Sequence, residues 1–284
     1  MTSSRLALVL PLLLVACAST PSADTTATSQ AADAGLDAAI AGAWRDPANV
    51  ARDPHRHPAQ TLRFFGVTPS SHVIEITPGG GWYTEILGPY LREEGHLVAA
   101  LAVAGPAQSE GLRNYLTKGN AGFRAKLAAG PAQYDRVEVR EFSVPQPVLG
   151  ADGSADVVLT FRNVHNWTQW GTDQAMFDAF FRVLKPGGVL GVVDHRAKPG
   201  TDLETMKKSG YLTEARVQEL AQRAGFVLEA RSEVNANPRD TTAHPNGVWT
   251  LPPSNRHDPE DAQMYRNIGE SDRMTLRFRK PARD

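Results

Sequence analysis

Three consecutive glycines lie in a segment whose residue types suit close contact with a polar ligand. The segment reads VIEITPGGGWYTEIL and spans residues 73–87. Glycine allows left-handed backbone conformations and lets backbone N–H groups come close to a ligand. A strand that passes through such glycines into a helix also presents the positive end of that helix. The loop alone is compatible with several dinucleotide cofactors and with a purely structural turn.

Two further groups of polar residues follow apolar runs of the sequence. Asn163 and His165 come after one run, and Asp194 and His195 come after another. An imidazole has an unperturbed pKa of about 6.5 and can act as a general base when a carboxylate orients it. His165, Asp194 and His195 are therefore the candidate catalytic residues. The structural alternatives are a loop-capping role for His165 and a turn-forming role for Asp194.

The sequence DPHRHP at residues 53–58 contains two histidines, His55 and His57, that are two residues apart. Neither cysteine nor a suitably spaced carboxylate accompanies them in the sequence, so we expect no metal site there. A structural lid is the interpretation that we favour for this segment. Arg56, between the two histidines, could reach the carboxylate of a bound cofactor.

Short apolar runs alternate with amphipathic stretches, which is the pattern of a parallel sheet with crossover helices. The runs predict strands at 72–76, 97–101, 137–142, 155–161, 189–193, 226–231 and 274–279, the last two antiparallel to each other. Apolar residues at helical spacing predict helices that start near Trp82 and that span 109–128, 171–184 and 212–224. KPGG at 185–188 should end the third helix and turn the chain into the next strand. The aperiodic stretch 235–270 is long enough to suggest a functional loop.

The first 17 residues, MTSSRLALVLPLLLVAC, have the features of an export signal. Arg5 precedes an apolar run that is shorter than the roughly 20 residues needed to span a membrane. The run ends in LVAC at Cys17, the only cysteine, and resembles the bacterial lipobox. We therefore expect a lipoprotein signal peptide over 1–16 and a lipid on Cys17. The lipid would hold the protein on the periplasmic side, at the outer membrane, whereas an ordinary cleavable signal is the alternative.

Composition divides the rest of the chain into a tether and one domain. Residues 17–45 are predicted to form a flexible tether and a short N-terminal helix, because the residues are small and polar as far as residue 35. A single domain is predicted over 46–284. Loss of Arg5 with the signal changes 30 basic and 31 acidic residues to a net charge of about −2. Without a basic block, we expect a small-molecule substrate, no nucleic acid, and membrane contact through the lipid alone.

Taken in chain order, several segments resemble the class I S-adenosylmethionine-dependent methyltransferases. They are the glycine segment, ADVVLTFRNVHNW at 155–167 and FRVLKPGGVLGVVDHR at 181–196. A narrower resemblance is to a group of exported bacterial lipoproteins assigned as methyltransferases of unknown substrate. It rests on RHPAQTLRFFG at 56–66, on PGGGWYTEIL, and on SDRMTLRFRKP at 271–281. The resemblance covers nearly all of 45–281. It implies an α/β, Rossmann-like fold with a seven-stranded, mostly parallel sheet, an antiparallel last strand, and S-adenosylmethionine as cofactor.

The resemblance also implies roles for individual residues. The first motif of the family, an acid followed by Gly-x-Gly-x-Gly, begins at Glu75 and places Thr77 where its first glycine is expected. The acid that normally binds the ribose hydroxyls would fall on Leu101, so this chain lacks that contact. Glu141 would lie near the adenine amino group. The residues implied to contact the cofactor are Glu75, Thr77, Gly79, Gly80, Gly81, Tyr83, Glu141 and Asn163.

Three functions are compatible with these features. The first is an S-adenosylmethionine-dependent methyltransferase of unspecified acceptor, anchored at Cys17. The alternative is a non-catalytic lipoprotein that keeps the methyltransferase fold and binds another small ligand; export favours it, because the cofactor is made in the cytosol, and so does Leu101. A nicotinamide-dependent oxidoreductase fits less well, because the Gly-x-Gly-x-x-Gly spacing and the acid about 20 residues further on are both absent.

Overall fold

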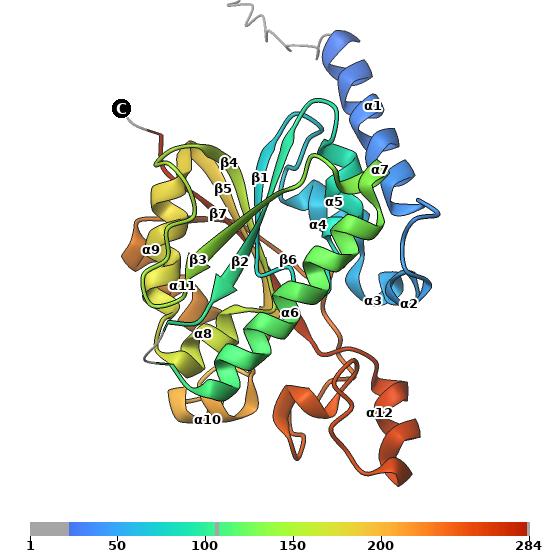
Figure 1. The fold of residues 1–284 in the computed structure, drawn as a ribbon. Coiled ribbons are helices and arrows are strands. Elements are labelled where there is room, and N and C mark those ends of the chain that lie inside the picture. The colour runs from blue at the N-terminus through green and yellow to red at the C-terminus, as the bar shows by residue number, and fades with distance from the viewer. Residues whose placement is uncertain (1–22, 106–107, 283–284) are drawn as a thin grey trace, which may run out of the picture.

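A seven-stranded sheet forms the centre of the molecule, with helices on both of its faces (Figure 1). The computed structural model describes residues 23–105 and 108–282. The strands are β1 (His72–Ile76), β2 (His96–Val103), β3 (Glu138–Ser143), β4 (Ala155–Phe161), β5 (Leu184–His195), β6 (Val227–Ser232) and β7 (Arg273–Arg279). Their order is β3-β2-β1-β4-β5-β7-β6, and only β7 runs antiparallel to its neighbours. The predicted fold class is confirmed.

The central strands are apolar because helices cover both of their faces. Val157 and Val158 of β4 are buried, as are Val73 and Ile74 of β1. Successive side chains of a strand point to opposite faces, so Val73 and Val157 belong to one core and Ile74 and Val158 to the other. A strand that is buried on both faces reads as a continuous apolar run, which is why the sequence predicts these two strands well.

The structure has helices on both sides of the sheet and beyond one end of it (Figure 1). They are α1 (Ala23–Ile40), α2 (Pro47–Val50), α3 (Asp53–Arg56), α4 (Pro58–Phe64), α5 (Thr84–Leu91), α6 (Glu110–Ala129), α7 (Pro131–Tyr134), α8 (Val164–Trp170), α9 (Asp173–Val183), α10 (Leu203–Ser209), α11 (Glu214–Ala224) and α12 (Ala262–Ile268). Helices α8, α9 and α11 contribute to one core, and α1, α4 and α5 contribute to the other. The predicted helices at 109–128, 171–184 and 212–224 correspond to α6, α9 and α11.

Three segments differ from the sequence prediction. The KPGG sequence at 185–188 lies within β5, because its glycines exchange backbone hydrogen bonds with Lys280 and so extend the β5–β7 ladder. The helix expected near Trp82 begins at Thr84, because the glycine turn continues through the two aromatic residues. The stretch 235–270 contains α12 and two 3₁₀ turns, η1 (Gly247–Thr250) and η2 (Pro259–Asp261).

Helix α1 occupies much of the segment that was expected to be a tether. Leu36 of α1 is buried in the core that α4 and α5 share. Arg63 of α4 also pairs with Asp33 at 2.5 Å and with Asp37 at 2.7 Å. The tether, predicted as far as residue 35, is therefore wrong over 23–35, where the chain is helical because alanine favours a helix and docking stabilises it. The predicted signal peptide and the predicted lipidation site, Cys17, lie outside the described residues. Within those residues, the structure contains no helix with the length and apolar character of a membrane span.

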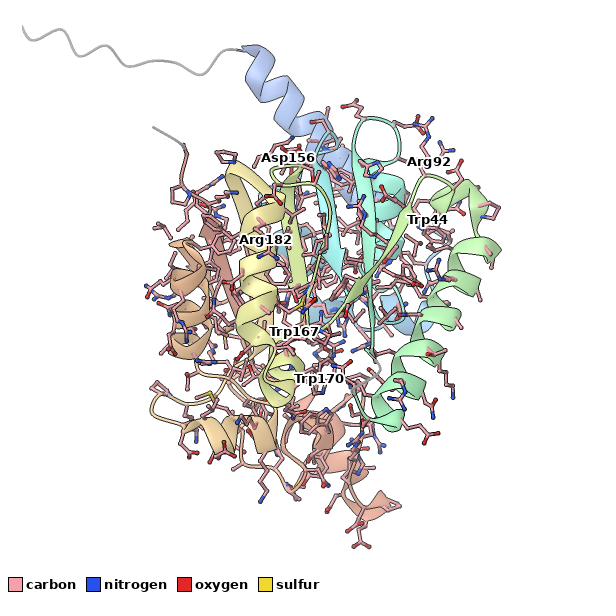
Figure 2. All side chains as sticks on the ribbon, turned by 60° about the vertical axis from the view of Figure 1, so that its left-hand side comes forward. Trp44, Arg92, Asp156, Trp167, Trp170 and Arg182 are labelled. Carbon is pink, nitrogen blue, oxygen red and sulfur yellow. The ribbon has the colours of Figure 1, made fainter. Side chains whose placement is uncertain are left out.

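The carboxyl ends of β1, β4 and β5 gather at one end of the sheet. Figure 2 marks this end by Trp167 and Trp170, which follow β4, and marks the opposite end by Asp156 and Arg92. Trp167 is buried and packs against the core, with its ring centroid 5.6 Å from that of Phe180. Ligands of open α/β sheets bind outside the carboxyl ends of the strands, so this end holds the candidate site.

Candidate functional site

The glycine loop lies directly after β1. Gly79 and Gly81 have left-handed backbones, with φ of +61° and +78°. A Cβ atom at Gly79 or Gly80 would meet nothing within 4 Å, so the backbone there borders open space. A Cβ atom at Gly81 would instead lie 3.2 Å from the ring of Phe123 on α6. Gly79 and Gly80 can therefore admit a ligand, whereas Gly81 allows α6 to pack against the loop.

Thr77 adopts a strained conformation at the start of this loop. Its φ of +48° lies in the left-handed region, which β-branched residues rarely occupy. Its backbone N–H donates to the carbonyl of Ala100 at 2.8 Å, which fixes the loop to β2. Its Oγ1 is buried and has no hydrogen-bond partner in the described part of the chain. Strain and an unsatisfied hydroxyl at one residue are typical of a site that a ligand completes.

Glu75 is a buried carboxylic acid at the end of β1. The hydroxyl of Thr84 donates to its Oε2 at 2.6 Å, and only 2% of the residue is exposed. Burial raises the pKa of Glu75 to about 7, because removal from water penalises the charged form. The carboxyl group is therefore poised to ionise when a cation approaches it.

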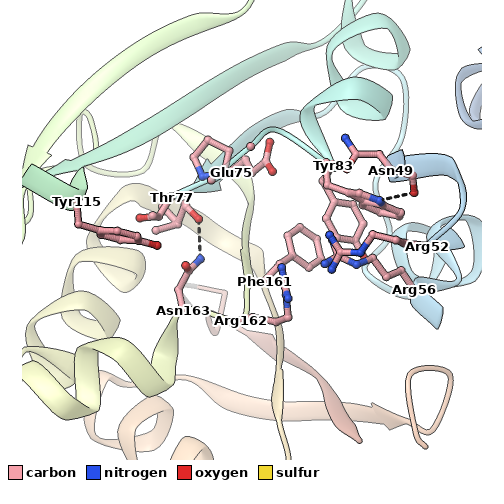
Figure 3. A pocket seen from close by; sticks show the side chains of 15 residues that line it. Asn49, Arg52, Arg56, Glu75, Thr77, Tyr83, Tyr115, Phe161, Arg162 and Asn163 are labelled. Atoms are coloured by element: carbon pink, nitrogen blue, oxygen red, sulfur yellow. Dashed lines mark hydrogen bonds between the residues drawn. The ribbon is translucent and has the colours of Figure 1, made fainter. Parts of the chain in front are cut away.

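The loop borders a cavity of about 200 Å³ (Figure 3). The predicted cofactor residues that line it are Glu75, Thr77, Gly79, Gly80, Tyr83 and Asn163. Residues outside the predicted set also line it, among them Asn49, Arg52, Tyr115, Phe161 and Arg162. Typical sites for small ligands have volumes of about 300–1,000 Å³. The enclosed part therefore suits a compact polar group, and a nucleoside would extend beyond it.

Two predicted cofactor residues shape the cavity from its walls. Asn163 donates from Nδ2 to the carbonyl of Ile76 at 2.9 Å, which ties the end of β4 to the end of β1. Tyr83 stacks on Phe161 with ring centroids 3.5 Å apart and planes at 11°. Burial raises the pKa of Tyr83 to about 12, so its hydroxyl stays protonated. Both residues are positioned to hold the cavity rigid.

Other residues implied by the family resemblance lie away from this cavity. Glu141 is exposed on the edge strand β3 and pairs with Arg124 of α6 at 2.7 Å. Leu101 is 2% exposed and packs beneath Phe123 of α6. The position where the resemblance places a ribose-binding acid is therefore part of the apolar core, and it offers no carboxylate.

The three candidate catalytic residues lie together, as their positions after β4 and β5 predict. Nδ1 of His165 is 2.8 Å from Oδ1 of Asp194. A carboxylate oxygen can only accept, so this contact assigns the proton to Nδ1 and leaves Nε2 of His165 able to accept a proton. The backbone N–H of His195 donates to the same carboxylate oxygen at 2.7 Å. Asp194 therefore orients His165 in the manner of a general base.

His195 stands beside this pair in a neutral state. Its Nδ1 is 2.5 Å from the hydroxyl of Ser271, and its ring centroid is 4.9 Å from that of His165. Burial, followed by the nearby His165 and Arg162, holds the pKa of His195 well below its ordinary value. Among the described residues, His165, Asp194 and His195 form the one group that offers three possible metal ligands within 4.8 Å. The positive charge of the nearby Arg162 disfavours a metal cation at this group.

Four arginines surround Glu270 next to the cavity, and we call this group the arginine box: Arg52, Arg56, Arg162 and Arg273. Glu270 accepts from Arg52 at 2.6 Å, from Arg273 at 3.0 Å and from Arg56 at 3.3 Å. Burial lowers the pKa of Arg56 to about 9 and that of Arg162 to about 10. The arginines, opposing the effect of burial, lower the pKa of Glu270 to about 2.

Sequence reasoning missed most of the arginine box. Its members come from α3 and the turn before it, the end of β4 and the start of β7, so no local motif connects them. Arg56 alone drew attention, as a candidate contact for a cofactor carboxylate. The one signal for the others is the position of Arg162, which directly follows the buried strand β4.

Comparison with known proteins identifies the fold. No family model matches the chain, and no curated protein sequence matches it. A S-adenosylmethionine-dependent methyltransferase from Aquifex aeolicus matches with a TM-score of 0.50 and 16% identity, over 87% of this chain and 98% of that one. The cyclase SpnF matches with a TM-score of 0.53 and 15% identity, over 81% of each chain. The same fold thus occurs with different reactions. The chain has the fold of the class I S-adenosylmethionine-dependent methyltransferases.

Proposed function

We propose that this protein is an S-adenosylmethionine-dependent methyltransferase. The observation that carries the proposal is the glycine loop after β1. Gly79 and Gly80 border open space, and the buried hydroxyl of Thr77 beside them has no partner in the described part of the chain. Buried polar groups are nearly always satisfied, so a polar ligand at this loop accounts for both features.

The residues present fit the methionine part of this cofactor. Glu75 would accept hydrogen bonds from its ammonium group, while the backbone at Gly79 and Gly80 allows close approach. Leu101 cannot hold the ribose, because its side chain is in the core. Tyr115 of α6 lines the same cavity and is 71% exposed, so we assign it to the nucleoside part.

The reaction requires an acceptor placed in line with the cofactor and, for many acceptors, removal of a proton. When bound, the cofactor would supply a methyl group on a sulfonium to the acceptor, and its sulfur would keep the electron pair of the carbon–sulfur bond. His165 would take the proton of the acceptor at Nε2, because its Nδ1 donates to Asp194. His195 is neutral and lies next to His165, where it would help to orient the acceptor.

Calorimetric titration of the full chain with S-adenosylmethionine and S-adenosylhomocysteine tests this function. We expect both to bind and Gly79→Ala to weaken binding at least about tenfold, because the new methyl group would occupy the space of the ligand. Gly153→Ala is the matched control. Gly153 also has a left-handed backbone and open space around it, with φ of +65°, but it precedes β4 at the opposite end of the sheet. Equal effects of the two variants, or no binding by the folded wild type, would refute the proposal.

A second candidate function is a non-catalytic lipoprotein that binds another small ligand. The apolar surroundings of Leu101 favour it, because they remove the usual ribose contact. The match to a cyclase is also compatible with it, because it means that a protein with this fold need not transfer methyl groups. Absence of any heat or thermal shift with either form of the cofactor, in a chain folded by circular dichroism, would favour this function over the first.

We also propose that the protein is anchored by a lipid on Cys17, on the periplasmic side of the outer membrane. The proposal is supported by the short apolar run that ends at the only cysteine of the chain. Cys17→Ser should release the protein from the membrane fraction while its circular dichroism spectrum stays unchanged. A variant that still sediments with membranes after a high-salt wash would exclude the lipid anchor.

A further inference from the structure

We propose that the arginine box binds a carboxylate or phosphate group of the methyl acceptor. The inference rests on the proposed methyl transfer and adds to it the chemical class of the substrate. It stands on the unused donors of the four arginines, on their position in the fold, and on the rigid framework around them.

The arginine box has more donors than its own carboxylate can satisfy. Glu270 takes one hydrogen bond from each of Arg52, Arg56 and Arg273. The Nη2 atoms of Arg52 and Arg56 and the Nε of Arg273 are buried without a hydrogen-bond partner in the described part of the chain. The guanidinium of Arg162 lines the cavity beside them, is only partly buried, and makes no hydrogen bond to another described residue. Unpaired buried cations are costly, so a second anion is the simplest partner for these donors.

The other nearby carboxylate does not fill this role. Asp194 lies close enough to act on Arg162 electrostatically. Its two oxygens, however, accept hydrogen bonds from the ring and backbone of His165 and from the backbone of His195. Four guanidinium groups thus share two carboxylates, one of which is committed to the histidines. The excess of positive charge remains available to a ligand.

The geometry suits an anion with two or three oxygens. A guanidinium presents a planar fork of donors that matches carboxylate and phosphate. Arg56 is 3% exposed, lines the cavity and is held over the ring of Trp82, with its Cζ atom 4.8 Å from the ring centroid. Arg52 and Arg162 line the same cavity (Figure 3). Donors that are already fixed lose little entropy on binding, so the site is preorganised.

The position of the box assigns the anion to the acceptor and not to the cofactor. Arg273 starts β7, which is separated from β1 by β4 and β5. In the β5–β7 ladder Arg273 is paired with His195. Arg162 directly follows β4, on the chain segment that leads to His165. An anion held here would bring the rest of the acceptor to the side of the site that carries His165 and His195.

Anion binding by the full chain tests the inference without an identified acceptor. Inorganic phosphate and malonate are each titrated calorimetrically into wild type, into Arg162→Met, and into Arg92→Met as the control. Arg92 pairs with Asp135 at 2.9 Å and lies at the opposite end of the sheet (Figure 2). We expect at least one anion to bind, its affinity to fall about tenfold or more in Arg162→Met, and no more than about a twofold change in Arg92→Met. Stronger binding of phosphate or of malonate distinguishes the two anion classes.

The same titration in the presence of saturating S-adenosylhomocysteine separates acceptor from cofactor. We expect the affinity for the anion to change by less than about twofold. Exclusion of the anion would show that the arginines hold the carboxylate of the cofactor, and binding of neither anion would show that the box is purely structural; each result would overturn the inference. If S-adenosylhomocysteine itself does not bind, the proposed function fails, whereas anion binding sensitive to Arg162→Met would still show an anion site.

Discussion

The substitution Arg162→Met should stabilise the protein and at the same time weaken its binding of anions. Its pKa is lowered from 12.5 to about 10, first by burial and then by neighbouring arginines, against the attraction of Glu270. At 1.36 kcal/mol per pKa unit, a pKa of about 10 instead of 12.5 corresponds to at most about 3 kcal/mol of destabilisation by the charged form at pH 8, because the side chain keeps part of its contact with water. Methionine keeps an unbranched side chain of similar length without the charge. The backbone at position 162 is left-handed, with φ of +61°, and its strain would be the same for methionine as for arginine. The strain therefore cancels when the two proteins are compared.

Arg162→Met is therefore expected to raise the free energy of unfolding by up to about 3 kcal/mol. For a domain of this size, that corresponds to an increase in Tm of about 6–12 °C. Thermal unfolding followed by circular dichroism at pH 8 measures the change. Arg92→Met is the control and should change stability by less than about 0.5 kcal/mol, because Arg92 is at the surface. A lower Tm for Arg162→Met would mean that Arg162 is stably paired, and the reasoning about unused positive charge would be wrong.

Three further predictions concern other residues of the site. Glu75 has a pKa of about 7 in the folded chain against 4.5 otherwise, so the folded state binds more protons in this window and stability should fall as pH rises from 4.5 to 7, by about 3 kcal/mol in all. Glu75→Gln should remove that part of the pH dependence, and an unchanged pH profile of urea unfolding would contradict it. Leu101→Asp should lower the free energy of unfolding by about 3–5 kcal/mol, because Leu101 is in the core; unaltered stability in urea would mean that this side chain faces the cleft. His165 should carry its proton on Nδ1, and the pKa of His195 should lie well below 6.5, so stability should decline below that pH. Side-chain ¹⁵N NMR measures the tautomer of His165 and the pKa of His195. A proton on Nε2 of His165 or a normal titration of His195 would contradict the general-base arrangement.

The sheet and the glycine loop could be predicted because their signals are local. A strand buried on both faces is a continuous apolar run, as in Ala155–Phe161, whose predicted and observed bounds agree. The loop at Gly79 needs glycine for its left-handed backbone, which the sequence displays directly. His165 and Asp194 follow neighbouring parallel strands, so topology alone brings them together.

The remaining features depend on tertiary contacts that sequence patterns do not record. Helix α1 is ordered by docking onto α4 and α5, although its composition also suits a tether. Glu141 has the residue type for adenine binding, yet its partner is Arg124 of α6. The arginine box joins three distant parts of the chain, and each arginine in isolation resembles an ordinary surface residue.

The most direct test of the account is an experimental structure of the full chain with S-adenosylhomocysteine. We predict that the homocysteine part lies over Gly79 and Gly80, with its amino group at Glu75 and a hydrogen bond to Oγ1 of Thr77. The arginine box should remain free of the ligand. A ligand bound elsewhere, or a carboxylate of this ligand held by Arg56 and Arg162, would contradict the assignment of the two parts of the site.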